Sequence, residues 1–415
     1  MLYRKIPKTG DRLSILGFGC MRLPQKKGRP GEGKIDEERA TRQVRHAIDR
    51  GVNYLDTAMP YHMGGSEAFL GRALTDGYRQ KVKLATKQPH WLVKTRQEMD
   101  RVLNTQLKNL RTETIDYYLI HNMWAENWER LLKLDVIDFL DQAKADGRIG
   151  DAGFSCHAPL EEFKSIVDGY DWTFCQIQYN FLDEKHQAGT EGLKYAAARD
   201  LGLIIMEPLR GGNLVGKVPD RVQKIWDEAD VQRSPAEWAL RWVWDHPEVT
   251  VVLSGMNEED HIEENLAIAE DTRPETLTTD ELALYSRVEK TYRELMKAPC
   301  TGCHYCMPCP KGVDIPGCFD CYNRHSMYND SSALLLYIMH MTDIKNEKPS
   351  LASQCVECGK CMEKCPQELP IPDLLKEVTE SLEGPRFQIM KRLIAVFFTF
   401  QRWGSLMKSS RFHRR

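Results

Sequence analysis

The stretch VKLATKQPHWLVKTRQEMDRVLNTQLKNL, residues 82–110, contains one complete βα unit. Its first five residues are a short apolar and β-branched run, which predicts a strand over 82–86. Residues 95–110 form an amphipathic stretch that is long enough for a helix. The run YYLIH at 117–121 then begins the next unit. A strand, a helix and a further strand in this order predict a parallel sheet.

The same alternation extends in both directions from this unit. We expect strands over residues 14–19, 53–56, 82–86, 117–121, 150–155, 173–178, 202–207 and 249–254. Helix-like segments lie between them, at residues 36–50, 95–110, 128–145, 160–167, 191–200, 235–244 and 259–269. Eight strands, each followed by a helix, within about 250 residues predict a (β/α)8 TIM barrel. Ahead of them, YRKIPKTGDRLSILG at 3–17 has a Thr-Gly turn between two short extended runs, which predicts a hairpin that plugs one end of the barrel.

The overall composition is that of a globular protein. The 415 residues are 42% hydrophobic and 28% charged, which excludes a disordered, collagen-like or multi-span membrane protein. The formal net charge of -3 gives no field that would attract nucleic acid. The charge is uneven, however, because residues 384–415 hold eight basic and no acidic side chains.

The cysteines are concentrated in one region. Ten of the 13 lie between residues 300 and 365. The first residues contain no apolar stretch of signal-peptide length, so we expect a cytoplasmic protein. In that reducing compartment clustered cysteines are metal ligands more often than disulfides.

Four polar residues stand at the ends of successive predicted strands or in the loop after one: Asp56, Tyr61, Lys87 and His121. In such a barrel the chemistry takes place at the carboxyl ends of the strands. A tyrosine has an ordinary pKa of roughly 10, and a neighbouring ammonium lowers it. A carboxylate would keep that lysine charged, and a histidine would hold a carbonyl oxygen in line with the phenol. Together these residues form a proton donor for a carbonyl that accepts hydride.

The sequence resembles the aldo-keto reductase family over residues 1–297. The motifs are NYLDTAMPYHMGGSEAFLGRAL (53–74), LATK (84–87), LIH (119–121), GFS (153–155), QIQYN (176–180), EPLRGG (207–212) and SGMNEEDHIEEN (254–265). The resemblance implies Tyr61 as general acid, Lys87 and Asp56 as the pair that tunes it, and His121 as the residue that orients the carbonyl. It also implies NADP or NAD across the barrel mouth. The nicotinamide carboxamide would contact Ser155 and Gln176, and the adenosine phosphate end would lie near Gly255, Met256, Asn257, Glu264 and Asn265.

Three positions depart from the family pattern. Cys156 stands where better-known members have an asparagine, and Met206 stands where they often have a tyrosine that stacks on the nicotinamide. His261, among acidic neighbours, stands where NADP-preferring members have an arginine. A 2'-phosphate needs fixed positive charge, so NADH is at least as suitable as NADPH.

Two cysteine runs follow the barrel. CTGCHYCMPCP contains Cys300, Cys303, Cys306 and Cys309, and CVECGKCMEKCP contains Cys355, Cys358, Cys361 and Cys365. The second run matches the C-x2-C-x2-C-x3-C-P pattern of bacterial ferredoxins, and the first is one residue shorter in its last gap. Zinc is the competing interpretation, although a zinc site needs four ligands and does not require two runs of four cysteines.

The two runs resemble those of helical two-cluster ferredoxin modules, and the region over 330–344 is expected to be helical. Ferredoxin-like wiring implies two [4Fe-4S] clusters, one on Cys300, Cys303, Cys306 and Cys365 and another on Cys355, Cys358, Cys361 and Cys309. Cys318 and Cys321 fall outside this pattern and are interpreted as buried spare cysteines. We therefore expect a barrel over 1–297, an iron-sulfur domain over 298–383 and a basic amphipathic tail over 384–415.

The apolar run of the tail, residues 393–400, is too short to span a bilayer. Its alternation of basic and apolar residues indicates an amphipathic helix on the protein's own acidic body or on a partner subunit; an anionic membrane surface is the alternative. No nucleic-acid-reading module accompanies the basic residues.

The combined hypothesis is a reversible hydride transfer between a nicotinamide and a small carbonyl or alcohol substrate. The clusters would serve electron transfer to a protein partner or redox sensing. The alternative is an iron-sulfur module for electron transfer or sensing whose barrel binds nicotinamide but is a poor catalyst. The sequence contains no flavin fingerprint.

Overall fold

The computed structural model describes residues 1–26, 34–212, 214–216, 218–300, 306–328, 332–342, 348–365 and 369–394. These residues form two compact units. The first comprises residues 1–216 and 229–285, and the second comprises 217–228 together with 286 onwards. The boundaries at 297 and 383 that the sequence indicates stay predictions.

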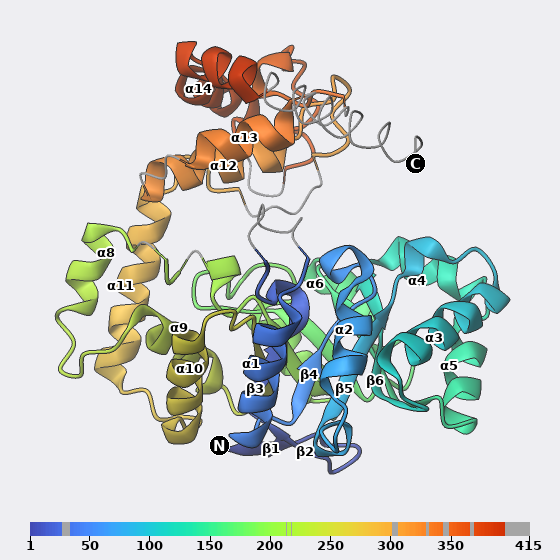
Figure 1. The fold of residues 1–415 in the computed structure, drawn as a ribbon. Helices are drawn as coiled ribbons and strands as arrows, with labels where there is room; N and C mark the ends of the chain where they lie inside the picture. The colour runs from blue at the N-terminus through green and yellow to red at the C-terminus, as the bar shows by residue number, and fades with distance from the viewer. Residues whose placement is uncertain are drawn as a thin grey trace, which may run out of the picture. The chain divides into compact units, whose positions relative to one another are not determined.

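The first unit is a closed barrel of eight parallel strands in the order β10-β3-β4-β5-β6-β7-β8-β9. Figure 1 shows the strands at the centre of this unit with helices around them. The strands are β3 (Leu16–Gly19), β4 (Tyr54–Asp56), β5 (Lys83–Gln88), β6 (Ile115–Met123), β7 (Ile149–Cys156), β8 (Phe174–Gln178), β9 (Gly202–Met206) and β10 (Val249–Ser254). The predicted (β/α)8 TIM barrel is confirmed.

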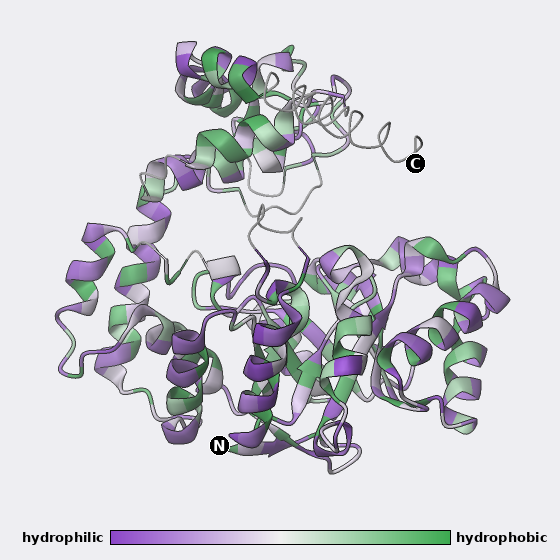
Figure 2. Ribbon diagram, viewed as in Figure 1, coloured by the Kyte–Doolittle hydropathy of each residue, from purple (hydrophilic) through white to green (hydrophobic). Residues whose placement is uncertain are grey.

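The helices α1 to α10 follow the strands in chain order. They are α1 (Glu37–Asp49), α2 (Ser66–Ala73), α3 (Arg96–Leu110), α4 (Ala125–Leu132), α5 (Val136–Ala145), α6 (Leu160–Val167), α7 (Gly189–Ala197), α8 (Asp220–Trp226), α9 (Pro235–Trp244) and α10 (Glu259–Asp271). Figure 2 shows both hydrophilic and hydrophobic residues on α3 and α5, as expected for helices with one face on a barrel.

The prediction of a single helix over residues 128–145 is wrong, because the chain forms α4 and α5 there. The break lies at Asp135, which has a left-handed φ of 56°. Aspartate adopts this conformation at a lower cost than most residues do. The apolar periodicity continues across the break and therefore conceals it.

The hairpin before the barrel forms as predicted. β1 (Tyr3–Lys5) pairs antiparallel with β2 (Arg12–Ser14). Ile6 and Leu13 are fully buried in one cluster with Tyr117 and Phe174 from the barrel strands. The hairpin therefore closes one end of the barrel with apolar side chains.

The second unit is mainly helical. It contains α12 (Ile315–Tyr328), α13 (Ser332–Met341) and α14 (Ile371–Leu382), while α11 (Thr279–Leu295) includes the division between the units. α13 is largely hydrophobic in Figure 2 and falls within the region expected to be helical. Phe319, Ile338 and Val378, from α12, α13 and α14, are fully buried together in its core.

Candidate functional site

Lys87 forms a buried ion pair at the mouth of the barrel. Its Nζ lies 2.7 and 2.6 Å from the two carboxylate oxygens of Asp56 and 2.8 Å from the Thr57 carbonyl oxygen. The two side chains are only 1% and 4% exposed. Burial alone lowers the pKa of Lys87, but Asp56 and Tyr61 outweigh it, so the pKa is raised and the lysine keeps its charge.

Tyr61 lies beside this pair. Lys87 Nζ is 3.4 Å from the Tyr61 hydroxyl oxygen and 5.0 Å from the centre of its ring. The tyrosine begins a short helical turn, Tyr61–Gly64, in which His62 and Met63 both have left-handed φ values, 52° and 54°. His62 fixes this loop, because its Nε2 accepts the Leu23 N–H at 3.1 Å.

The pKa of Tyr61 moves against our expectation. Burial raises it, and Lys87 lowers it by a smaller amount, so the net direction is upward. The expected lowering was wrong in its net direction because it considered the charge of Lys87 without the loss of water around the phenol. The hydroxyl therefore stays protonated at neutral pH, which suits a proton donor.

His121, in β6, faces the phenol ring. The two ring centres are 6.3 Å apart and the ring planes are at 82°. Burial, and then the charge of Lys87, lowers the pKa of His121 to about 3, so the imidazole is neutral. Its Nδ1 is buried and has no hydrogen-bond partner within the described part of the chain. The Trp91 ring, 46% exposed, lies 5.2 Å from it and covers the imidazole with an apolar surface.

Ser155, next to the last residue of β7, pairs in register with Gln176, in the middle of β8. Ser155 Oγ accepts the Asn122 N–H at 2.8 Å. Gln176 Oε1, Gln178 Oε1 and Asn122 Oδ1 are buried acceptors without a partner among the described residues. Because buried polar atoms are rarely left unpaired, acceptors at a barrel mouth indicate a place for a ligand with N–H donors. A carboxamide has such donors.

Two of the departures from the family pattern make contacts of their own. Cys156 Sγ accepts the Ala158 N–H at 3.2 Å, and burial raises the pKa of this thiol to about 12. Met206 Sδ accepts a hydrogen bond from Gln176 Nε2 at 3.6 Å. The Met206 sulfur therefore orients the amide of Gln176 and leaves its oxygen free.

The loop after β10 carries the remaining predicted cofactor residues. Met256 is buried, the Asn257 carbonyl accepts from Gln43 Nε2 at 3.2 Å, and Asn265 Nδ2 donates to Ser254 Oγ at 3.0 Å. Gly255 lies between β10 and Met256, and Glu264 is half-buried on α10 next to Asn265.

The charges near this loop are largely paired. Arg39 NH2 lies 2.6 Å from Glu258 Oε2 and also contacts Glu259. The hydrogen bond from Arg39 lowers the pKa of Glu259 to about 2, so this carboxylate remains charged. His261 is exposed.

The site residues are divided between two parts of the barrel. Asp56, Tyr61, Lys87 and His121 lie on β4, β5 and β6 or in the loop after β4. The predicted cofactor residues lie on β7 and β8 or after β10.

In the second unit, four cysteines lie near one another. Burial raises the pKa of the Cys361 thiol, and Cys355, Cys309 and Cys358 each raise it further. These four are the set that ferredoxin-like wiring assigns to one cluster. Cys300, Cys306 and Cys365 pack against the core of the same unit. Cys303 lies outside the described residues.

The described residues contain no group of three or more His, Cys, Asp or Glu side chains that could hold a single metal ion. The thiolates of a four-iron cluster bind four different irons, so this finding concerns sites for one ion such as zinc. Cys318 and Cys321 are buried in the core, as their interpretation as spare cysteines predicts.

Residues 385–394, the described start of the basic tail, are helical. Phe387 is buried in the core of the second unit, and Met390 and Ile394 pack against that core. Ile389 and Leu393 are exposed. Residues 395–415, and with them most of the tail on which the membrane alternative rests, lie outside the described residues. No helix in the described ranges is long and apolar enough to span a membrane.

Sequence reasoning missed several residues of this mouth: Thr57, Trp91, Asn122 and Gln178. Asn122 directly follows His121, and Trp91 comes four residues after Lys87. The available signal was their place after a predicted strand or, for Gln178, at the end of one.

Comparisons with known proteins find relatives of the barrel and of the cysteine-rich region. Residues 299–369 match the 4Fe-4S dicluster domain. Aldo-keto reductase YhdN of Bacillus subtilis is 27% identical over 229 residues, which cover 53% of this chain and 66% of that protein. The NADH-specific methylglyoxal reductase of Escherichia coli is 23% identical over 312 residues, which cover 64% and 93%.

Solved structures show the same fold. An aldo-keto reductase from Bacillus halodurans in its holo form has a TM-score of 0.58 and 23% identity, covering 69% of this chain and 96% of that one. An aldo-keto reductase from Klebsiella pneumoniae in complex with NADPH has a TM-score of 0.56 and 20% identity, covering 70% and 96%. Residues 15–282, more than half of the chain, match the model of the aldo/keto reductase family. The chain therefore belongs to the aldo/keto reductase family of oxidoreductases, and a 4Fe-4S dicluster domain follows its barrel.

Proposed function

We propose that the barrel reduces a small carbonyl compound, or oxidises the corresponding alcohol, with a nicotinamide cofactor. The observation that carries this proposal is the buried Lys87–Asp56 pair, whose ammonium lies 3.4 Å from the Tyr61 hydroxyl and opposite a neutral His121. This arrangement supports a proton donor and a neutral imidazole that act together at the carboxyl ends of the strands.

The nicotinamide, when bound, supplies the hydride that adds to the carbonyl carbon. The Tyr61 hydroxyl donates a proton to the carbonyl oxygen, so one hydride and one proton convert the carbonyl to an alcohol. Lys87 stabilises the phenolate that remains, and Asp56 keeps Lys87 charged and in place. His121 orients the carbonyl oxygen by a hydrogen bond from its neutral ring, and Trp91 excludes water beside it.

We propose that Gln176 and Ser155, with Asn122, hold the carboxamide of the nicotinamide. The unpartnered oxygens of Gln176 and Asn122 would accept its N–H groups. Gly255, Met256, Asn257, Glu264 and Asn265 would surround the adenosine end. Because Arg39 is already paired with Glu258 and Glu259, we propose NADH rather than NADPH as the preferred cofactor.

The direct test is carbonyl-dependent oxidation of NADH and of NADPH, measured with a series of small, aliphatic and aromatic aldehydes and ketones. We expect turnover with at least one class of carbonyl and a higher kcat/KM for NADH. Glu258→Gln should narrow the difference between the two cofactors, because it frees part of the Arg39 charge for a phosphate. Oxidation with neither cofactor would contradict the function, and a clear preference for NADPH would contradict the cofactor assignment alone.

We further propose two [4Fe-4S] clusters in the second unit. One would be bound by Cys309, Cys355, Cys358 and Cys361, because the first three of these raise the pKa of the Cys361 thiol. The other would be bound by Cys300, Cys303, Cys306 and Cys365. Such clusters transfer single electrons, whereas hydride transfer moves two at once, so we propose that they serve a separate electron-transfer protein partner or sense redox state. We place the protein in the cytoplasm, where thiols stay reduced.

The cluster assignment predicts a defined loss of metal. Protein prepared without oxygen should contain about eight irons per chain, and Cys361→Ser should contain about four. Cys321→Ser, which removes a thiol outside both sets, should retain the full content. Iron, acid-labile sulfide and the EPR spectrum of the reduced protein measure this. Full iron content in Cys361→Ser would overturn the assignment. Zinc without acid-labile sulfide would show that the cysteines bind zinc and not iron-sulfur clusters.

A further inference from the structure

Behind Lys87, a cluster of polar side chains is buried between β5, β6 and the helices α2 and α3. Glu67, Thr86, Gln106 and Tyr118 are at most 1% exposed. None of them touches the carboxylate or the phenol of the candidate site in the contacts of the described residues. Buried polar groups are costly unless they are hydrogen-bonded, so such a cluster needs a structural or functional reason.

The position of this cluster follows from the unequal lengths of two strands. β4 ends at Asp56, opposite Ala85 of β5. The Ala85 carbonyl still accepts the Thr57 N–H at 2.9 Å. Because backbone groups alternate along a strand, the Lys87 carbonyl points to the same side, where β4 has already ended. Gln106 Nε2 donates to this carbonyl at 2.9 Å and takes the place of a strand neighbour.

Gln106 is itself held at both ends of its amide. Its Nε2 also donates to Glu67 Oε1 at 2.8 Å, and its Oε1 accepts from the Tyr118 hydroxyl at 2.7 Å. The Glu67 carboxylate is fixed in turn by Thr86 Oγ1 at 2.7 Å and by Asn109 Nδ2 at 3.3 Å. The Tyr118 hydroxyl also contacts Gln88 Oε1, so its single proton is shared between two acceptors. The orientation of the Gln106 amide follows instead from the Lys87 carbonyl, which can only accept and so requires the amide nitrogen to face it.

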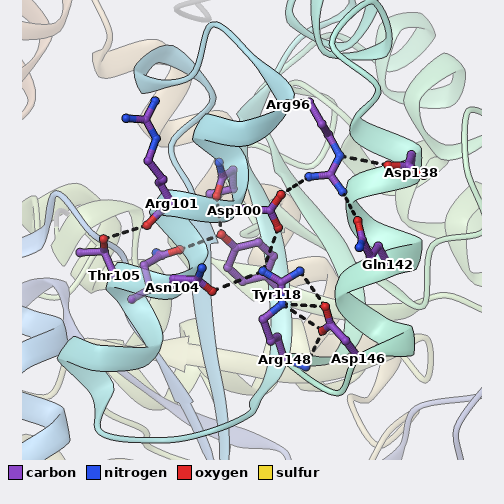
Figure 3. A network of polar contacts seen from close by, with 12 residues as sticks. Arg96, Asp100, Arg101, Asn104, Thr105, Tyr118, Asp138, Gln142, Asp146 and Arg148 are labelled. Carbon is purple, nitrogen blue, oxygen red and sulfur yellow. Dashed lines mark hydrogen bonds and ion pairs between the residues drawn. The ribbon is translucent and has the colours of Figure 1, made fainter.

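The helix that carries Gln106 is also anchored on its outer side (Figure 3). Asp100 of α3 accepts from Arg148 at 2.8 Å and also pairs with Arg96. Arg96 donates in addition to Gln142 of α5 at 2.8 Å. α3 is thus bonded to α5 and to the start of β7, and these contacts fix the position of the backbone that carries Gln106.

We propose that Gln106 is a positioning residue for Lys87, which acts on proton donation from Tyr61 by fixing the backbone of the lysine. This proposal rests on the proposed function of the barrel. Of the four polar contacts of Lys87 Nζ, the one to Tyr61, at 3.4 Å, is the longest. A long contact weakens first when the backbone of the lysine shifts. Small misplacements of catalytic groups lower rates by large factors.

The test is Gln106→Met, which preserves side-chain volume and removes the three hydrogen bonds that the amide makes with Lys87, Glu67 and Tyr118. We expect kcat to fall by about 10- to 100-fold with the KM for the carbonyl and the affinity for nicotinamide unchanged. With Lys87 farther away, the pKa of Tyr61 should rise, so the alkaline limb of the kcat profile should move to higher pH. Gln106→Asn, which keeps an amide but withdraws it by one methylene, should change both quantities in the same direction and fold more readily.

Two matched variants separate positioning from other causes. Of the hydrogen bonds of the Gln106 amide, Tyr118→Phe removes only the one to Oε1 and keeps the one from Nε2 to the Lys87 carbonyl. Glu67→Gln removes the charge but keeps an oxygen that accepts from Gln106. Both should retain the kcat profile of the unaltered protein. If Tyr118→Phe reproduces the effect of Gln106→Met, general loosening of α3 is responsible and the proposal is overturned.

The pKa of Tyr61 can also be followed without any substrate. The difference in tyrosinate absorbance between each variant and the same variant with Tyr61→Phe isolates this residue. An unchanged Tyr61 pKa in both Gln106 variants would overturn the positioning role even if the enzyme is active. Full activity of Tyr61→Phe would instead overturn the proposed function, and the absorbance titration would still decide the role of Gln106.

Discussion

Tyr61→Phe will lower kcat for carbonyl reduction by about three orders of magnitude, because a positioned general acid contributes typically 10²- to 10⁴-fold. The phenyl ring keeps the packing beside His121 and the face presented to Lys87, but it has no proton to donate. The affinity for nicotinamide, measured by fluorescence titration, should be unchanged, since Tyr61 is not among the residues proposed to hold it.

The control for this variant is Tyr78→Phe. This variant also loses a phenol hydroxyl that has a charged partner, here the Asp49 carboxylate at 2.8 Å, but Tyr78 lies on the surface. Its kcat should equal that of the unaltered protein. If Tyr61→Phe were as active as Tyr78→Phe, the proton would come from another group, and the alternative of an electron-transfer module with a poorly catalytic barrel would gain support.

The pH profile gives a second check on the same assignment. The pKa of His121 is lowered to about 3, and that of Tyr61 is raised by burial. Neither group changes its protonation between pH 5 and 8, so kcat should be level over that range. Reduction should slow only at alkaline pH, as the Tyr61 proton is lost.

Lys87→Met will lower the free energy of unfolding by about 3–5 kcal/mol at pH 8, because it leaves the Asp56 carboxylate buried without its cation. Burial already raises the pKa of Asp56, and without Lys87 the folded-state pKa rises further above the unfolded value. An acid with a raised folded pKa stabilises the fold below its unfolded pKa and loses that contribution as pH rises through the folded pKa. The loss should therefore be smaller at pH 5 than at pH 8. Urea denaturation at the two pH values measures it.

A lysine on the same strand provides the control. Lys83 pairs with Asp11 at 2.8 Å, but its side chain is 38% exposed. Lys83→Met should cost less than about 1 kcal/mol. The double variant Asp56→Leu with Lys87→Met, which removes both charges, should regain most of the lost stability. Equal losses of stability in Lys87→Met and Lys83→Met would show that Lys87→Met does not leave the Asp56 carboxylate buried without a cation.

The strands and several helices could be read from periodicity because each buries one face against a single core. β10 and α6 occupy the expected residues, 249–254 and 160–167. Asp56, Lys87 and His121 could be found for the same reason, since the end of a strand fixes the place of its last side chains. Tyr61 lies in the loop after β4 and was found by its closeness in sequence to Asp56. The family resemblance then supplied the roles that position alone does not give.

Other features depend on contacts between distant segments, which periodicity does not contain. Gln106 and Glu67 look like the polar positions of solvated helix faces, yet both are buried against β5. The pKa of Tyr61 needed the balance of burial against charge, and only the folded loop provides it. The break at Asp135 interrupts an apolar pattern that is otherwise continuous.

The division of the site between β4–β6 and β7–β10 has a consequence for recombination. A crossover between two related genes, placed after β6, would transfer the proton-handling residues as one block, together with Arg39 and Asn122. The cofactor residues on β7 and β8 and after β10 would stay those of the recipient. Arg148 limits where that crossover can fall, because its ion pair with Asp100 joins α3 to the beginning of β7. Chimaeras joined after residue 148 would inherit both partners from one parent, whereas those joined before it would separate them. The most favourable junction for such chimaeras therefore lies directly before β7, after residue 148.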